Sequence, residues 1–168
     1  ATQELWQYRT DPPEFSVAVG SCTYINDIEY DRPGKPYGGQ YEIFESIHAK
    51  QPNMMLWLGD NTYFRDADLA SESTMNYRYS HTRNIEELKD LLASCPHYAI
   101  WDDHDFGPDN SNSSFSGKNE ARTSFMNFWA NKQYGVQNES IYSKFGCNGV
   151  DFFLLDNRWY RTAQGCVG

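Results

Sequence analysis

Three carboxylates and an imidazole occupy four consecutive positions of the sequence, residues 102–105. They follow the short apolar run 98–100 and Trp101. Like charges packed this tightly repel one another unless a cation or a hydrogen-bond network stabilises them. The pattern therefore predicts a strand that ends by delivering ligands to a metal ion, with Asp103 and His104 as the first candidates.

Two other predicted strands also end in side chains that can bind metals. Cys22 follows the run 15–20, while Asp60 and Tyr63 follow the run 54–58. The carboxyl ends of neighbouring parallel strands meet at one edge of a sheet, where ligands usually bind. Thiolate, phenolate, carboxylate and imidazole together suit a trivalent ion such as iron beside a harder divalent ion. Asp60 is the candidate for bridging the two ions.

Each of these residues taken alone has a structural explanation. A cysteine after a strand usually packs, an aspartate after glycine often caps a turn, and a tyrosine often packs in the core. Asp102 has the alternative of bracing its loop, and Asp105 that of orienting a ligand rather than binding metal. The coincidence of three strand ends with suitable chemistry favours the metal site.

The surrounding elements predict an α/β fold in a single domain of 168 residues. Strands alternating with helices favour a mixed sheet covered by helices. Hydrophobic periodicity and turn residues predict five strands, over 15–20, 54–58, 98–101, 140–145 and 150–155. They also predict helices over 41–50 and 119–134, a stretch of two helices over 71–93 with 84–93 as its clearest segment, and a flexible loop over 107–118.

Charge and hydropathy narrow the function. The net charge is −9 and no Lys/Arg cluster is present, so we expect no nucleic-acid-binding face. An acidic chain also repels phosphate esters unless bound cations invert the local field. No apolar run reaches the roughly 20 residues that span a bilayer, so we expect no membrane span. The start of the sequence lacks the features of a signal peptide, which we expect to have been removed.

Motifs of several other enzyme classes are missing. The sequence contains no GxSxG elbow, no GxxxxGK[ST] or GxGxxG phosphate loop and no HExxH zinc motif. A glycosidase that uses two carboxylates remains an alternative, although abundant acids and aromatics are an unspecific signal.

Four motifs in order resemble those of the PhoD-like alkaline phosphatases, which belong to the calcineurin-like metallophosphoesterase superfamily. The resemblance runs from about residue 15 to residue 161. It is carried by Gly20-Ser21-Cys22, by Leu58-Gly59-Asp60 with Tyr63, by Trp101-Asp102-Asp103-His104-Asp105, and by Leu155-Asp156-Asn157-Arg158-Trp159-Tyr160-Arg161.

The resemblance implies hydrolysis of phosphate monoesters or diesters by a metal-bound hydroxide in an αββα sandwich. It further implies a ferric ion paired with calcium, with another divalent metal as the alternative to calcium. Carried over residue by residue, Cys22 and Tyr63 would bind iron, and Asp60 would bridge the metals. Asp103 would be a further metal ligand, and Asn110 would reach the second metal.

The remaining motif residues would act on the substrate. His104 matches the histidine that assists the leaving group. Arg158 and Arg161 are candidates for phosphate contact, with the alternative that Arg158 braces the sheet by pairing with a carboxylate.

The resemblance covers only the N-terminal half of the family's catalytic domain. The family's second half supplies further Asp and His ligands, whereas this sequence has no histidine after His104. We therefore expect the chain to be part of a larger domain, about half of the sandwich, with the missing C-terminal half as its partner. The alternative is a non-catalytic metal- and ligand-binding protein that retains a half-site. The calcium dependence implied by the resemblance predicts an extracellular or periplasmic location.

Overall fold

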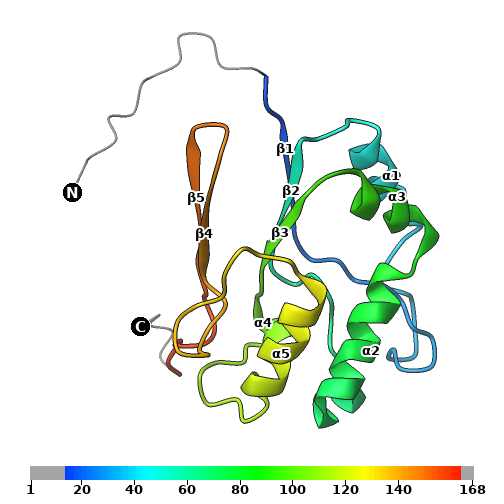
Figure 1. Ribbon diagram of the computed structural model, residues 1–168. Coiled ribbons are helices and arrows are strands. Elements are labelled where there is room, and N and C mark those ends of the chain that lie inside the picture. The colour runs from blue at the N-terminus through cyan, green and yellow to red at the C-terminus, as the bar shows by residue number, and fades with distance from the viewer. Residues whose placement is uncertain (1–13, 164–168) are drawn as a thin grey trace.

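A parallel sheet lies between a layer of helices and a β-hairpin in the computed structural model, which describes residues 14–163 (Figure 1). The sheet has the order β1-β2-β3, and both neighbouring pairs are parallel. The strands are β1 (Val17–Gly20), β2 (Met54–Leu58), β3 (His97–Ile100), β4 (Ser143–Cys147) and β5 (Val150–Leu154). The helices are α1 (Ile43–His48), the 3₁₀ helix η1 (Asp66–Ala70), α2 (Glu72–Arg83), α3 (Glu86–Ser94), α4 (Asp103–Phe106) and α5 (Lys118–Phe128).

One face of the parallel sheet packs against the helices. Side chains alternate between the two faces of a strand, so Met55, Trp57 and Ala99 point to the same side. All three are buried in one apolar cluster. The helices contribute further buried side chains to this cluster: Phe44, Tyr79, Leu88, Leu91 and Phe125.

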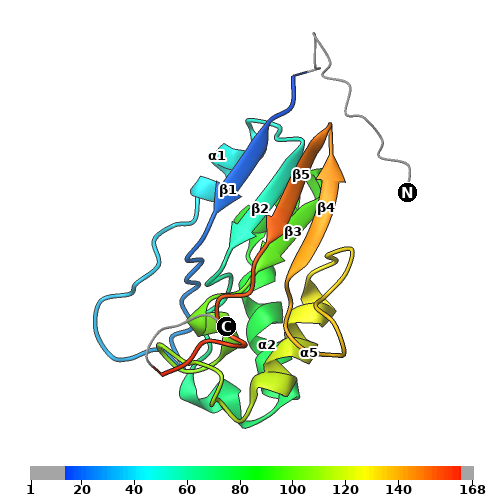
Figure 2. The same ribbon diagram turned by 90° about the vertical axis from the view of Figure 1, so that its left-hand side faces the viewer.

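The other face of the sheet packs against the hairpin β4–β5. Met54 forms a second apolar cluster with Phe145 and Leu154, and the ring of Tyr98 stacks on Phe145 with centroids 3.8 Å apart. Seen onto the hairpin, β4 and β5 lie in front of the sheet and the helices lie behind it (Figure 2). The fold class predicted from the sequence is confirmed: helices cover one face of the parallel sheet, and the hairpin packs against part of the other face.

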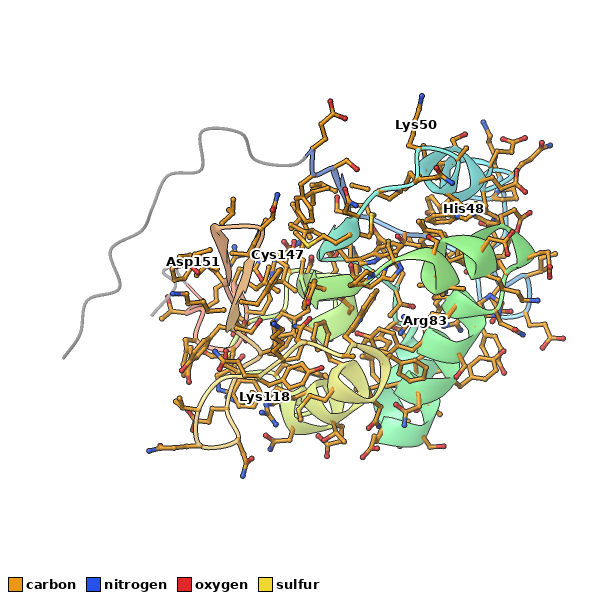
Figure 3. All side chains as sticks on the ribbon, turned by 45° about the horizontal axis from the view of Figure 1, so that its top comes forward. His48, Lys50, Arg83, Lys118, Cys147 and Asp151 are labelled. Carbon is orange, nitrogen blue, oxygen red and sulfur yellow. The ribbon has the colours of Figure 1, made fainter. Side chains whose placement is uncertain are left out.

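Long polar side chains connect the helical layer to the rest of the chain. Arg83, near the end of α2, donates a hydrogen bond to the carbonyl of Phe128 at the end of α5. Lys118, at the start of α5, places its Nζ 4.6 Å from the centre of the Trp159 ring (both cationic residues are labelled in Figure 3). These contacts hold α5 against both α2 and the segment that follows β5.

The stretch 71–93 forms two helices, α2 and α3, as predicted. Two other predictions about elements need correction. The helix predicted over 119–134 ends at Phe128, because the Asn131 side chain bonds both the N–H and the C=O of Ala99 on β3. The acidic stretch after β3 begins one turn of helix, α4, rather than an extended loop.

No helix within residues 14–163 is long and apolar enough to cross a membrane.

Candidate metal centre

The carboxyl ends of β2 and β3 bring three potential ligands together. The nearest ligand atoms of Asp60, Asp103 and His104 all lie within 4.8 Å of one another. Asp60 and Asp103 are buried, whereas His104 is half-buried. The sequence predicted this convergence from parallel strand ends.

A tight turn after β2 brings Asp60 to α4. Gly59 has φ +91°, and Asp60 itself has φ 52°. A Cβ on Gly59 would lie 2.7 Å from the Cβ of Asp102 and 2.9 Å from its backbone nitrogen. Glycine is therefore needed here both for its backbone conformation and for the close approach of the two strand ends.

Asp105 fixes the two strand ends to each other. Its buried carboxylate accepts backbone N–H groups from Asp60 at 3.2 Å, Asn61 at 3.0 Å and Asp102 at 2.6 Å. The amide of Asn61 donates a fourth bond at 2.7 Å. Burial raises the pKa of Asp105 well above its usual range, against the backbone N–H groups that lower it. Asp105 thus holds the ends of β2 and β3 together at the site. Its partner Asn61 was not predicted from the sequence.

Cys22 and Tyr63 both approach the same oxygen of Asp60. The Cys22 Sγ lies 3.7 Å from Asp60 Oδ2, and the Tyr63 hydroxyl donates to that oxygen at 3.2 Å. Burial, the Cys22 thiol and Asp60 all raise the pKa of Tyr63. Residues from all three strand ends therefore meet at one carboxylate.

The negative charge of Asp60 is incompletely compensated by the protein. Burial raises its pKa most, and Asp103 and Asp102 raise it further, whereas the His104 backbone N–H and side chain lower it. A bound cation would stabilise such a charge directly. The sulfur, oxygen and nitrogen donors gathered here fit iron together with a harder divalent ion.

Asn110 reaches Asp103 through its backbone rather than its side chain. Its N–H donates to Asp103 Oδ2 at 2.6 Å, while its amide nitrogen donates to Asp109 at 2.9 Å. The structure therefore brings Asn110 to the site, with its amide oriented toward Asp109.

Arg158 is buried and engaged with carboxylates. Its Nε donates to Asp102 at 2.6 Å, and its Nη2 lies 3.5 Å from Asp103. Asn157 also donates to Asp102, at 2.7 Å. This geometry favours the bracing role among the two alternatives for Arg158. Arg161 is partly exposed, and its backbone C=O accepts from Ser113.

His104 stands at the boundary between the acidic cluster and an open pocket. Its ring centre lies 4.4 Å from that of Tyr63, and its Nε2 lies 3.6 Å from Asp109. A pocket of about 1040 Å³ begins at these residues and extends along the loop after Cys22. This pocket was not predicted from the sequence, although the recurring tyrosines of residues 24–37 were a signal for it.

Known proteins share the sequence pattern and the fold of this chain. A family model described as PhoD-like phosphatase matches residues 17–167. No curated protein matches the chain. A solved structure titled "Structure of PhoD" superposes with a TM-score of 0.65 at 17% sequence identity, covering 88% of this chain and 32% of that chain. The chain thus spans about a third of that structure's length and shares its fold. The match over residues 17–167 establishes that the chain belongs to the PhoD-like phosphatase family.

Proposed function

We propose that the protein hydrolyses phosphate monoesters or diesters with the help of metal ions. The observation that carries this proposal is the convergence of Asp60, Asp103 and His104 within 4.8 Å. Membership of the PhoD-like phosphatase family supports the reaction class. Because the chain covers 32% of the solved PhoD structure, the activity is proposed for the whole protein.

The residues suited to hold metal lie around Asp60. In this proposal Cys22, Tyr63 and Asp60 would hold Fe³⁺, and Asp60, Asp103 and Asn110 would hold Ca²⁺. When bound, the ions would supply positive charge for the phosphate oxygens and lower the pKa of water that attacks phosphorus.

His104 is proposed as the acid that gives its proton to the departing alcohol. Its position favours this role, because the ring is 28% exposed and borders the pocket while its backbone is fixed. The His104 N–H donates to Asp60 at 3.3 Å, and its C=O accepts from Phe64 at 3.0 Å. Arg161 is the proposed phosphate contact, since the guanidinium of Arg158 is engaged by Asp102, Asp103 and the carbonyl of Ser111.

Exposed apolar side chains are evidence for a further part of the protein that completes the αββα sandwich. Val19 and Leu58, on the hairpin side of the parallel sheet, are 56% and 43% exposed. Phe153 and Leu155, on β5 and just after it, are 65% and 70% exposed. Exposed apolar surface of this kind usually marks an interface. We propose that the C-terminal half of the same catalytic domain covers these residues. From the calcium dependence that the family resemblance implies, we further propose an extracellular or periplasmic location.

Hydrolysis by the protein expressed from its full coding sequence tests the proposal. We expect turnover of p-nitrophenyl phosphate or bis-p-nitrophenyl phosphate that chelation abolishes and added iron and calcium restore. His104→Ala should lower kcat by about 10²–10⁴-fold if the imidazole transfers a proton. His48→Ala, at the end of α1, is the matched control and should keep full activity.

Two outcomes would contradict the proposal. A loss of less than threefold in His104→Ala would assign the histidine a purely structural role. Bound metal without hydrolysis of either ester would favour the non-catalytic binding protein instead.

A further inference from the structure

The pocket beside His104 has a wall of aromatic rings that leads away from the acidic cluster. The centre of the Tyr63 ring lies 4.4 Å from that of His104 and 5.0 Å from that of Tyr24. Tyr24 in turn contacts Tyr37 edge-on at 5.2 Å. Tyr37 is 64% exposed, so its ring is available to a ligand. An aromatic ring of a ligand bound in this pocket would therefore have aromatic side chains to contact between His104 and Tyr37.

The charges in the pocket are predominantly negative. Among the described residues that line it are four carboxylates and two guanidinium groups. One guanidinium, that of Arg65, is engaged: it pairs with Asp31 at 2.6 Å and also donates to the carbonyls of Ile25 and Tyr63. Its planar group additionally covers the Tyr24 ring at 4.5 Å.

The charges that remain available would repel an anion. Asp109 faces His104 Nε2 at 3.6 Å and accepts a hydrogen bond from the Asn110 amide, which leaves Glu29 and Asp66 against the single guanidinium of Arg32. These three side chains are exposed and can adjust to a ligand. A ligand group that carries its own negative charge, such as a second phosphate, would meet unfavourable electrostatics here.

We propose that this pocket holds the alcohol part of the phosphate ester and selects a ring-bearing group without negative charge. The inference rests on the proposed function, because it places the reacting phosphate at the acidic cluster and the leaving group beside His104. The aromatic wall then supplies ring contacts, and the surplus of carboxylates excludes anionic alcohols. The preferred substrates are accordingly esters of uncharged ring alcohols rather than nucleotides with several phosphates.

Binding of two isosteric phenols tests the pocket without any need for turnover. 4-Hydroxybenzamide and 4-hydroxybenzoate share a ring and hydroxyl group but differ by one negative charge at pH 7. Titration monitored by NMR or calorimetry should give about tenfold tighter binding of the amide. Equal affinity, tighter binding of the benzoate, or no binding of either phenol would overturn the proposal.

Variants of the aromatic wall identify the site of binding. Tyr37→Ala should weaken binding of the amide about fivefold, whereas Tyr37→Phe should keep it because the ring remains. Tyr160→Ala, an exposed tyrosine outside the pocket, is the control and should bind like the original protein. Unchanged binding in Tyr37→Ala would place the phenol elsewhere and refute the aromatic subsite.

Charge variants test the selectivity. The double variant Glu29→Gln/Asp66→Asn should reduce the preference for the amide to about threefold or less. Glu45→Gln/Asp90→Asn removes two exposed carboxylates outside the pocket and should leave the preference intact. An unchanged preference in the first variant would refute the proposal that these carboxylates exclude anionic alcohols.

Hydrolysis assays distinguish this proposal from the proposed function. Selective phenol binding without turnover would reject the proposed hydrolase activity and retain the aromatic subsite.

Discussion

The three carboxylates of residues 102–105 have different partners in the fold. Asp105 is surrounded by N–H donors from both strand ends. Asp102 pairs with Arg158 at 2.6 Å. Asp103 accepts the Asn110 N–H and lies in the cluster with Asp60. Identical side chains in one short motif therefore divide into two that brace the site and one that is suited to bind metal.

The pH dependence of stability tests the environment of Asp60. Burial raises its pKa above the usual 3.8, so the folded chain binds this proton more tightly than the unfolded chain does. The stability gained in this way is present below the ordinary pKa and is lost as the pH rises through the raised one. Metal-free protein should therefore lose stability above about pH 4.

Asp60→Asn should reduce this dependence to the part that the buried Asp105 contributes. It should not disturb the turn, because asparagine tolerates the positive φ of this position. Thermal unfolding of chelated protein from pH 4 to pH 8 measures it. Asp90→Asn, an exposed carboxylate on α3, should keep the original profile. If Asp60→Asn also kept it, the uncompensated charge assigned to Asp60 would be wrong.

The sequence predicted the candidate metal ligands better than the residues that hold those ligands in place. Cys22, Asp60, Tyr63, Asp103 and His104 follow from the rule that parallel strands end together, and the structure brings all five close. Pairing of Arg158 with a carboxylate was one of two alternatives, but neither Asp102 as its partner nor Asn61 as the partner of Asp105 was predicted. These hydrogen bonds span 56 and 44 positions of the chain, and local sequence pattern contains no information on such pairings.

The elements carrying the site are connected by close backbone contacts. Gly59, between β2 and Asp60, is packed directly against Asp102 at the end of β3. Gly59→Ala should cost about 3 kcal/mol, from the positive φ together with the clash against Asp102. Urea unfolding measures this. Gly39→Ala, in a loop with no atom within 4 Å of the added Cβ, should cost far less. Equal costs would contradict the close approach.

Arg158 connects the segment after β5 to the end of β3. Arg158→Met removes the charge but keeps most of the length, and leaves Asp102 without its ion-pair partner. We expect a loss of about 2–3 kcal/mol in the free energy of unfolding. Arg161→Met should have a small effect on stability. An unchanged stability in Arg158→Met together with a raised KM would instead assign Arg158 to phosphate binding.

The helical and strand boundaries show which elements local sequence determines. The prediction for β2 is confirmed at both ends because its apolar run is bounded by Asn53 and Gly59. The end of α5 was predicted wrongly, because Asn131 bonds the β3 backbone and the chain must leave the helix first. The helix α4 was missed, since four residues are too few for a periodic signal.

At the scale of the whole molecule, the fold combines an acidic chain with a proposed anionic substrate. The net charge is −9, and the site itself contains several carboxylates. Bound cations would reverse the local field at the phosphate, while the neighbouring pocket would keep its negative potential. The sequence predicted this need for cations from composition and motif, but it did not predict the pocket, which forms from loops that meet only in the fold.

The most direct test of the account is the metal content of the protein expressed from its full coding sequence. Elemental analysis should find iron and calcium in the purified protein, both strongly reduced in Asp60→Asn and retained in Asp90→Asn. Calcium alone, tightly held, would favour a non-catalytic half-site. Protein without bound metal, or with the same metal content in Asp60→Asn, would contradict the central claim that the strand ends around Asp60 form a metal centre.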